Sequence, residues 1–184
     1  MEQITTTRRG LLAIAAGGLT LAACGGGDEP GPARGPTRES QAATLNSTLA
    51  WELAVVAVYR ASLPLLRGGE RRTLAEIAAQ EQAFAEQLTA LVRRYGGEPA
   101  RAKPLGEYRR SFPPLRDAPD VLAFVTDVEE RSVRKYLEAL PRVTGAELRR
   151  PLAEMAVSQG RHLAVVRALD GEQPAPHAFV TGTQ

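Results

Sequence analysis

The sequence has one cysteine, few aromatic residues and no segment with the alternating apolar and polar residues of a half-buried β-strand. A single cysteine excludes an internal disulfide, so packing must stabilise the fold. The chain also lacks a phosphate-binding glycine loop, a cysteine-based metal motif and a Ser-His-Asp set, and we predict no catalytic residue. Its 23 basic and 21 acidic residues give a net charge of only +2. This balance, without basic runs interleaved with aromatics, argues against nucleic acid as a partner.

The N-terminal segment has the features of an export signal. Arg8 and Arg9 precede an apolar run of thirteen residues, Leu11–Ala23, which is too short to span a bilayer and fits a signal peptide. The run ends in Leu-Ala-Ala-Cys, which is typical of a lipobox, so we expect a lipid on Cys24 rather than a buried thiol. The paired arginines favour twin-arginine export and leave ordinary secretion open. The prediction is an extracytoplasmic lipoprotein whose partner is the membrane.

The remaining composition divides the chain into three further parts. Residues 24–41 are rich in glycine, proline and charge, which predicts a flexible tether. Residues 42–170 contain long helical patterns and form the predicted domain, and residues 171–184 form a proline-containing tail. At 184 residues and 43% hydrophobic content, the chain is long enough for one domain with its own core.

Apolar residues at spacings of three and four predict four long amphipathic helices. The apolar stripes run over residues 45–63, 74–95, 122–140 and 148–169. Short glycine-containing turns join the first pair and the last pair, while a long proline-rich segment, residues 96–118, joins the second stripe to the third. The expected fold is all-α, an antiparallel four-helix bundle with one long crossover between helices 2 and 3.

Each stripe is interrupted near its middle by a polar residue, in order Glu52, Glu81, Glu129 and Gln159. A buried carboxylate needs a partner or a metal ion, so these interruptions predict a site. Their distances from the turns place all four at about the same height in the bundle. Glu130 would be the inward carboxylate if the register of that helix were shifted by one residue.

The two halves of the domain resemble each other. Glu52 and Glu129 are each followed seven residues later by a tyrosine, Tyr59 or Tyr136, and then by a Leu-Pro pair. The segments Leu-Ala-Glu-Ile-Ala at 74–78 and Leu-Ala-Glu-Met-Ala at 152–156 also match. Under this match Glu81 corresponds to Gln159, and the residues three positions later, Phe84 and His162, correspond to each other.

On these residues the segment from 42 to about 170 resembles the ferritin-like superfamily, and in particular the extracytoplasmic ferritin-like domain proteins of bacteria. The resemblance implies a di-metal centre in which two helices each supply a Glu, and the other two each supply a Glu and a His three residues later. It also implies iron or manganese chemistry or iron storage. Phe84 stands where a His ligand is expected and Gln159 where a Glu is expected, so the centre is predicted to be degenerate.

Three states of this layer remain open. The first is a metal-free polar layer in which Gln159, His162, Tyr59 and Tyr136 bond the three carboxylates. The second is a single Fe, Mn or Zn ion bound by ligands listed in sequence order as Glu52, Glu81, Glu129 and His162. The third is a two-metal oxidase site. The loss of two ligands favours a non-catalytic binding or structural module without a cofactor, and a metal-binding protein or oxidase is the alternative.

Overall fold

The computed structural model describes residues 35–177 and 181–182, so the predicted signal peptide and Cys24 lie outside the described residues. The described chain contains four long helices and one short helix, in order α1 (Arg38–Ser62), α2 (Gly68–Arg94), α3 (Leu105–Arg109), α4 (Ala118–Ala139) and α5 (Ala146–Leu169). No strand occurs in these described ranges. The all-helical prediction is therefore confirmed for them.

Side-chain caps determine where two of the long helices begin. Thr37 accepts a hydrogen bond from the backbone N–H of Ser40 at 3.1 Å, and α1 starts at Arg38, inside the segment that we expected to be tether. The polar composition of residues 38–41 had concealed this first turn. Asp117 caps α4 in the same way, accepting from the N–H of Asp120 at 3.1 Å.

The two short turns use proline and glycine as the sequence indicates. Pro64 and Pro141 each lie in a 3-10 turn that directly follows a long helix, η1 (Leu63–Leu65) after α1 and η2 (Leu140–Arg142) after α4. A glycine with positive φ follows at the start of the next helix, 55° at Gly68 and 83° at Gly145. Any residue with a side chain would be strained in this backbone conformation. The chain reverses at both places, and this reversal pairs α1 with α2 and α4 with α5.

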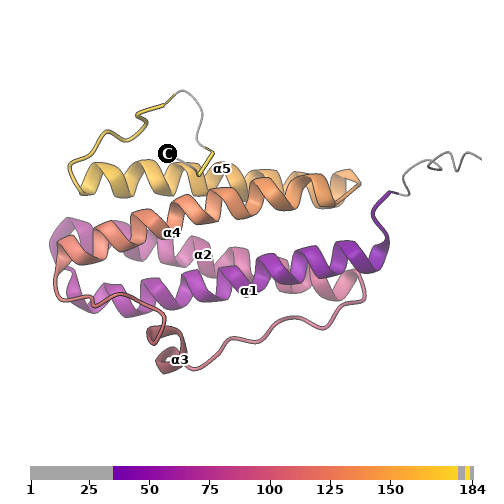
Figure 1. The fold of residues 1–184 in the computed structure, drawn as a ribbon, viewed down its shortest axis with the longest axis horizontal. Helices are drawn as coiled ribbons and strands as arrows, with labels where there is room; N and C mark the ends of the chain where they lie inside the picture. Colours follow the sequence, from indigo (N-terminus) through magenta and orange to yellow (C-terminus); the bar gives the residue numbers. More distant parts are fainter. Residues whose placement is uncertain (1–34, 178–180, 183–184) are drawn as a thin grey trace, which may run out of the picture. The chain divides into compact units, whose positions relative to one another are not determined.

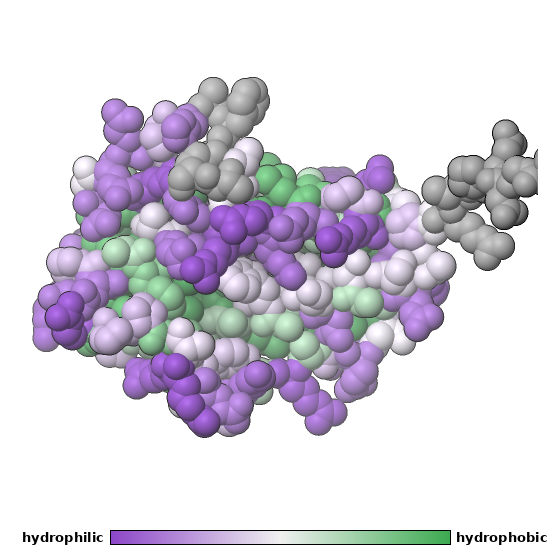
Figure 2. All heavy atoms as spheres, viewed as in Figure 1, coloured by the Kyte–Doolittle hydropathy of each residue, from purple (hydrophilic) through white to green (hydrophobic). Residues whose placement is uncertain are grey.

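The four long helices lie side by side, and the connection that contains α3 runs along them past α1 (Figure 1). The most extensive contacts are within the pairs α1–α2 and α4–α5, and α1 and α4 join one pair to the other. Polar and charged side chains cover much of the face shown in Figure 2, with hydrophobic side chains between them. This arrangement directs the apolar stripes inward.

The buried core consists of two hydrophobic clusters. One contains Leu49, Leu88, Leu152 and Met155, and the other contains residues such as Val55, Ile77, Val125 and Val166. On α1 the change from one cluster to the other falls at Glu52, between Leu49 and Val55, and on α5 it falls between Met155 and Val166. A layer of polar residues therefore divides the core.

One helical stretch, Arg38–Leu65, is long and apolar enough to cross a membrane when judged by length and composition alone. In the structure 56% of its apolar window is buried. Core helices of soluble bundles pass the same test, and Glu52 lies fully buried within this helix. We therefore interpret the stretch as a core helix.

Candidate metal centre

The four residues that interrupt the apolar stripes lie inside the bundle. Glu52, Glu81, Glu129 and Gln159 each have 0% of their surface exposed, and His162 has 3%. Each comes from a long helix whose remaining inward positions are apolar, so the folding of the stripe also buries the polar group. Glu130, the alternative for α4, is only partly buried and forms an ion pair with Arg167, so Glu129 is the inward carboxylate.

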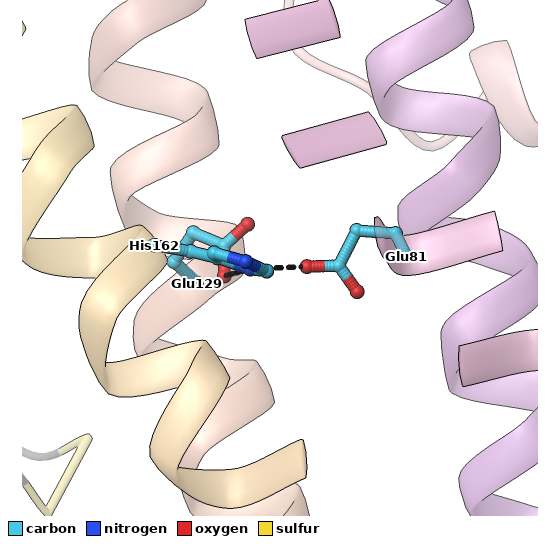
Figure 3. A group of neighbouring side chains, drawn as sticks. All are labelled: Glu81, Glu129 and His162. Carbon is cyan, nitrogen blue, oxygen red and sulfur yellow. Dashed lines mark hydrogen bonds and ion pairs between the residues drawn. The ribbon is translucent and has the colours of Figure 1, made fainter. Parts of the chain in front are cut away.

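Three potential metal ligands converge from three helices. Oxygens of Glu81 and Glu129 and a ring nitrogen of His162 all lie within 4.8 Å of one another. His162 Nδ1 is 2.7 Å from Glu81 Oε1 and 3.9 Å from Glu129 Oε2, and Figure 3 shows Glu81 of α2 reaching toward the imidazole on α5. This combination of carboxylate and imidazole ligands suits Fe, Mn or Zn.

The amide of Gln159 occupies the other side of the layer. Its Nε2 donates to Glu81 Oε2 at 2.9 Å and to Glu52 Oε1 at 3.2 Å, and so ties these two carboxylates together. A carboxylate at this position would be a negatively charged ligand, whereas the amide is neutral and uses its hydrogens on its neighbours. Glu52 is therefore linked to Glu81 through Gln159, and it is not one of the three residues whose ligand atoms lie within 4.8 Å of one another.

The two tyrosines of the repeat have different partners. The Tyr59 hydroxyl forms a short hydrogen bond to Glu129 Oε1, whereas the equally buried Tyr136 hydroxyl, which lies near Glu52, makes no hydrogen bond of normal geometry. Burial, followed by the negative charge of nearby carboxylates, raises the pKa of both phenols well above the usual value. Both hydroxyls therefore stay protonated at neutral pH.

Burial also raises the pKa of Glu52 and of Glu129 well above the usual value, and the charge of Glu81 acts in the same direction on both. Several acceptor atoms in the layer have no hydrogen-bond partner, namely Glu52 Oε2, Glu129 Oε2 and Gln159 Oε1. Without a cation the layer must therefore take up protons. A divalent ion beside Glu129 would supply the missing partner instead.

Phe84 lies next to His162, with ring centroids 6.2 Å apart and planes inclined by 18°. A phenyl ring cannot bind a metal, so this helix contributes only Glu81 to the layer. Trp51 donates from its indole N–H to Ser132 Oγ at 2.9 Å and so links α1 to α4.

Sequence reasoning missed one residue that contacts the group. Gln80 directly precedes Glu81, and its Oε1 lies 3.1 Å from His162 Nε2. Gln80 is exposed and lies off the apolar stripe of α2, so the hydrophobic pattern carries no signal for it. Consecutive residues of one helix thus face the two nitrogens of the same imidazole.

Comparisons with known proteins agree with this architecture. A ferritin-like, diiron-carboxylate protein from Bacillus anthracis is similar in fold, with a TM-score of 0.60 and 18% identity over 72% of this chain and 96% of that one. A conserved hypothetical protein from Mycobacterium tuberculosis is similar with a TM-score of 0.65 and 16% identity over 78% and 99% of the two chains. A search of curated proteins found no match. The ferritin-like domain family matches residues 40–172, and the chain belongs to that family.

Proposed function

We propose that this protein binds one divalent metal ion through Glu81, Glu129 and His162, inside an antiparallel four-helix bundle with one long crossover. The observation that carries the proposal is the convergence of these three buried ligands within 4.8 Å. Glu129 Oε2, which accepts no hydrogen bond, supports the proposal, because a buried carboxylate oxygen needs a donor or a cation. A bound ion would neutralise the two carboxylates and act as a Lewis acid.

One ion fits this site better than two. In the ferritin-like di-metal pattern, two of the helices each supply a Glu and a His three residues later. Here those helices are α2 and α5, so the pattern needs a His at position 84 and a Glu at position 159. This chain has Phe84 and Gln159 at those positions, and the Gln159 amide already donates to Glu52 and Glu81. The side of the layer with Glu52 therefore lacks one histidine and one carboxylate of the pattern that would hold a second ion. We accordingly propose a binding module and not a two-metal oxidase.

A second candidate is a metal-free polar layer with a structural role. It is favoured by the 2.7 Å contact between His162 and Glu81 and by the two hydrogen bonds of Gln159, which satisfy part of the layer without any ion. In this state Glu52 and Glu129 carry protons, in keeping with the upward shift of their pKa values.

Metal analysis separates the two candidates. The full-length protein is produced with iron, manganese and zinc supplied, and its metal content is measured beside that of Glu81→Ala and His162→Ala. Two exposed residues provide matched controls, Glu86→Ala on the same helix as Glu81, and His177→Ala for the chain's other imidazole. We expect close to one ion per chain in the wild type and controls and a loss of at least tenfold in the site variants. Equal metal content in all five proteins would refute the site.

We also propose that the domain is held at the outer face of a membrane by a lipid on Cys24. The lipobox-like sequence that ends at Cys24 supports this proposal. We expect Cys24→Ser to remain an uncleaved precursor that incorporates no labelled fatty acid, while the wild type is cleaved and labelled. Normal cleavage of Cys24→Ser would contradict the lipid anchor and would leave the proposed metal site unaffected.

A further inference from the structure

His162 is the only member of the three-ligand group with any exposed surface, and it lies at the floor of a surface groove. The groove runs between α2 and α5, and its lining consists of Thr73, Glu76, Ile77, Gln80, Arg161, His162 and Val165. The outer nitrogen of the imidazole thus faces a different environment from the inner one. Nδ1 faces buried carboxylates, whereas Nε2 faces a side chain at the surface.

That side chain is Gln80, which holds the outer edge of the ring. Gln80 Oε1 is 3.1 Å from His162 Nε2, while Glu81 Oε1 is 2.7 Å from Nδ1. Because these two residues are adjacent on α2, their side chains point in different directions, and each contacts a different nitrogen of the ring. The ring therefore cannot turn without breaking a contact with α2.

Arg161 indicates which atom of the Gln80 amide faces the ring. Its Nη2 lies 3.4 Å from the same Gln80 oxygen, and a guanidinium only donates hydrogen bonds. The atom between Arg161 and His162 is therefore the amide oxygen, an acceptor, and Nε2 must carry a proton to bond with it. Nδ1 is then the nitrogen that faces the layer, and in the metal-free protein its 2.7 Å contact with Glu81 Oε1 requires a proton on Nδ1 or on that carboxyl, which a metal ion would replace.

We infer that Gln80 is a positioning residue that holds His162 with a proton on Nε2 and turns Nδ1 toward Glu81 and Glu129. This inference rests on the proposed function in one respect only, namely that Nδ1 becomes the nitrogen bound to the ion. The hydrogen bond to Gln80 fixes the orientation of the ring and makes Nδ1 a better ligand, as outer partners of metal-bound histidines do.

The inference can be tested first without metal. The chain has only two histidines, so nitrogen NMR of His177→Gln protein reports on His162 alone. In this background we compare the protein that keeps Gln80 with three variants. Gln80→Leu removes the acceptor and Gln80→Glu keeps one, while Glu76→Gln is a control in the same groove. We expect the Nε2 proton to exchange faster with solvent in Gln80→Leu, and to remain as protected as in the wild type in Gln80→Glu and Glu76→Gln. Identical Nε2 spectra for Gln80 and Gln80→Leu would overturn the inference.

Zinc, a diamagnetic ion, provides the second test. We expect zinc to bind through Nδ1 while Nε2 keeps its proton, and Gln80→Leu to weaken zinc affinity by about 10- to 100-fold, with Gln80→Glu restoring it. Zinc bound through Nε2, or unchanged affinity in Gln80→Leu, would refute the positioning role. If wild-type protein binds no metal, the proposed function fails, and the metal-free spectra still decide whether Gln80 holds the ring.

Discussion

Tyr59 on α1 donates its hydroxyl hydrogen to Glu129 on α4, so the first half of the internal repeat bonds a carboxylate of the second half. The reciprocal pair, Tyr136 and Glu52, lies close together without a hydrogen bond of normal geometry. The repeat is therefore symmetric in sequence and asymmetric in its contacts. The side with the hydrogen bond is also the side on which Glu81 and His162 approach Glu129.

This asymmetry predicts different effects for two matched substitutions. Tyr59→Phe leaves a buried carboxylate without its donor and should lower the free energy of unfolding by about 1–3 kcal/mol. Tyr136→Phe removes a hydroxyl that lies near Glu52 but makes no hydrogen bond of normal geometry, and it should have a smaller effect. Urea denaturation of the metal-free proteins measures both values. Equal losses in the two variants would contradict the difference between the two hydroxyls, because both substitutions keep the aromatic ring and remove only the O–H group.

Much of the fold follows from positions that the sequence marks clearly. The Leu-Pro pairs at Pro64 and Pro141 mark the ends of α1 and α4, because a proline cannot continue the backbone hydrogen bonding of a helix. Glu52 and Gln159 stand out because a polar residue in an apolar stripe must be buried along with it. Both kinds of signal are local, and one sequence is enough to detect them.

Other features depend on contacts between distant segments. Gln80 reaches His162 only because α2 and α5 pack side by side, and an exposed glutamine within a helix has no distinctive pattern. The short helix α3 lies within a proline-rich connection, where composition favours irregular structure. The unequal bonding of Tyr59 and Tyr136 cannot be read from the repeat, because their sequence spacings are the same.

The carboxyl of Glu52 should make the stability of the metal-free protein depend on pH. Its pKa is raised in the folded state, mainly by burial, so the folded protein binds more protons than the unfolded one above pH 4.5, the usual value. The contribution of Glu52 to the free energy of unfolding is therefore complete below that pH. It is lost as the pH rises toward the folded-state pKa, at up to about 1.4 kcal/mol per pH unit for each such carboxyl.

We expect Glu52→Gln to remove the part of this pH dependence that the Glu52 carboxyl causes. The variant should be as stable as the wild type near pH 4 and more stable at pH 7, because the amide carries no charge to bury and can still accept from Gln159. Thermal denaturation in a chelating buffer from pH 4 to pH 8 measures the difference, with Glu86→Gln as an exposed control. A Glu52→Gln protein that is less stable than the wild type at pH 7 would contradict this assignment.

Restoring the two missing ligands tests whether the layer is a reduced di-metal centre. Phe84→His combined with Gln159→Glu recreates the pattern in which two helices each provide Glu and, three residues later, His. We expect the double variant to bind two ions per chain, measured by elemental analysis, against one in the wild type. The gain needs both changes, because Phe84 offers no ligand atom and the neutral amide of Gln159 brings no negative charge for a second ion.

The same pair of substitutions should lower the stability of the protein when metal is removed. Gln159→Glu replaces an amide that donates to Glu52 and Glu81 with a fourth carboxylate, so the metal-free double variant should be markedly less stable than the wild type. Metal should then stabilise the double variant more than the wild type, because more buried negative charge is neutralised. A double variant that binds one ion and tolerates chelation as the wild type does would mean that these four helices hold their ligands in a geometry built for a single ion.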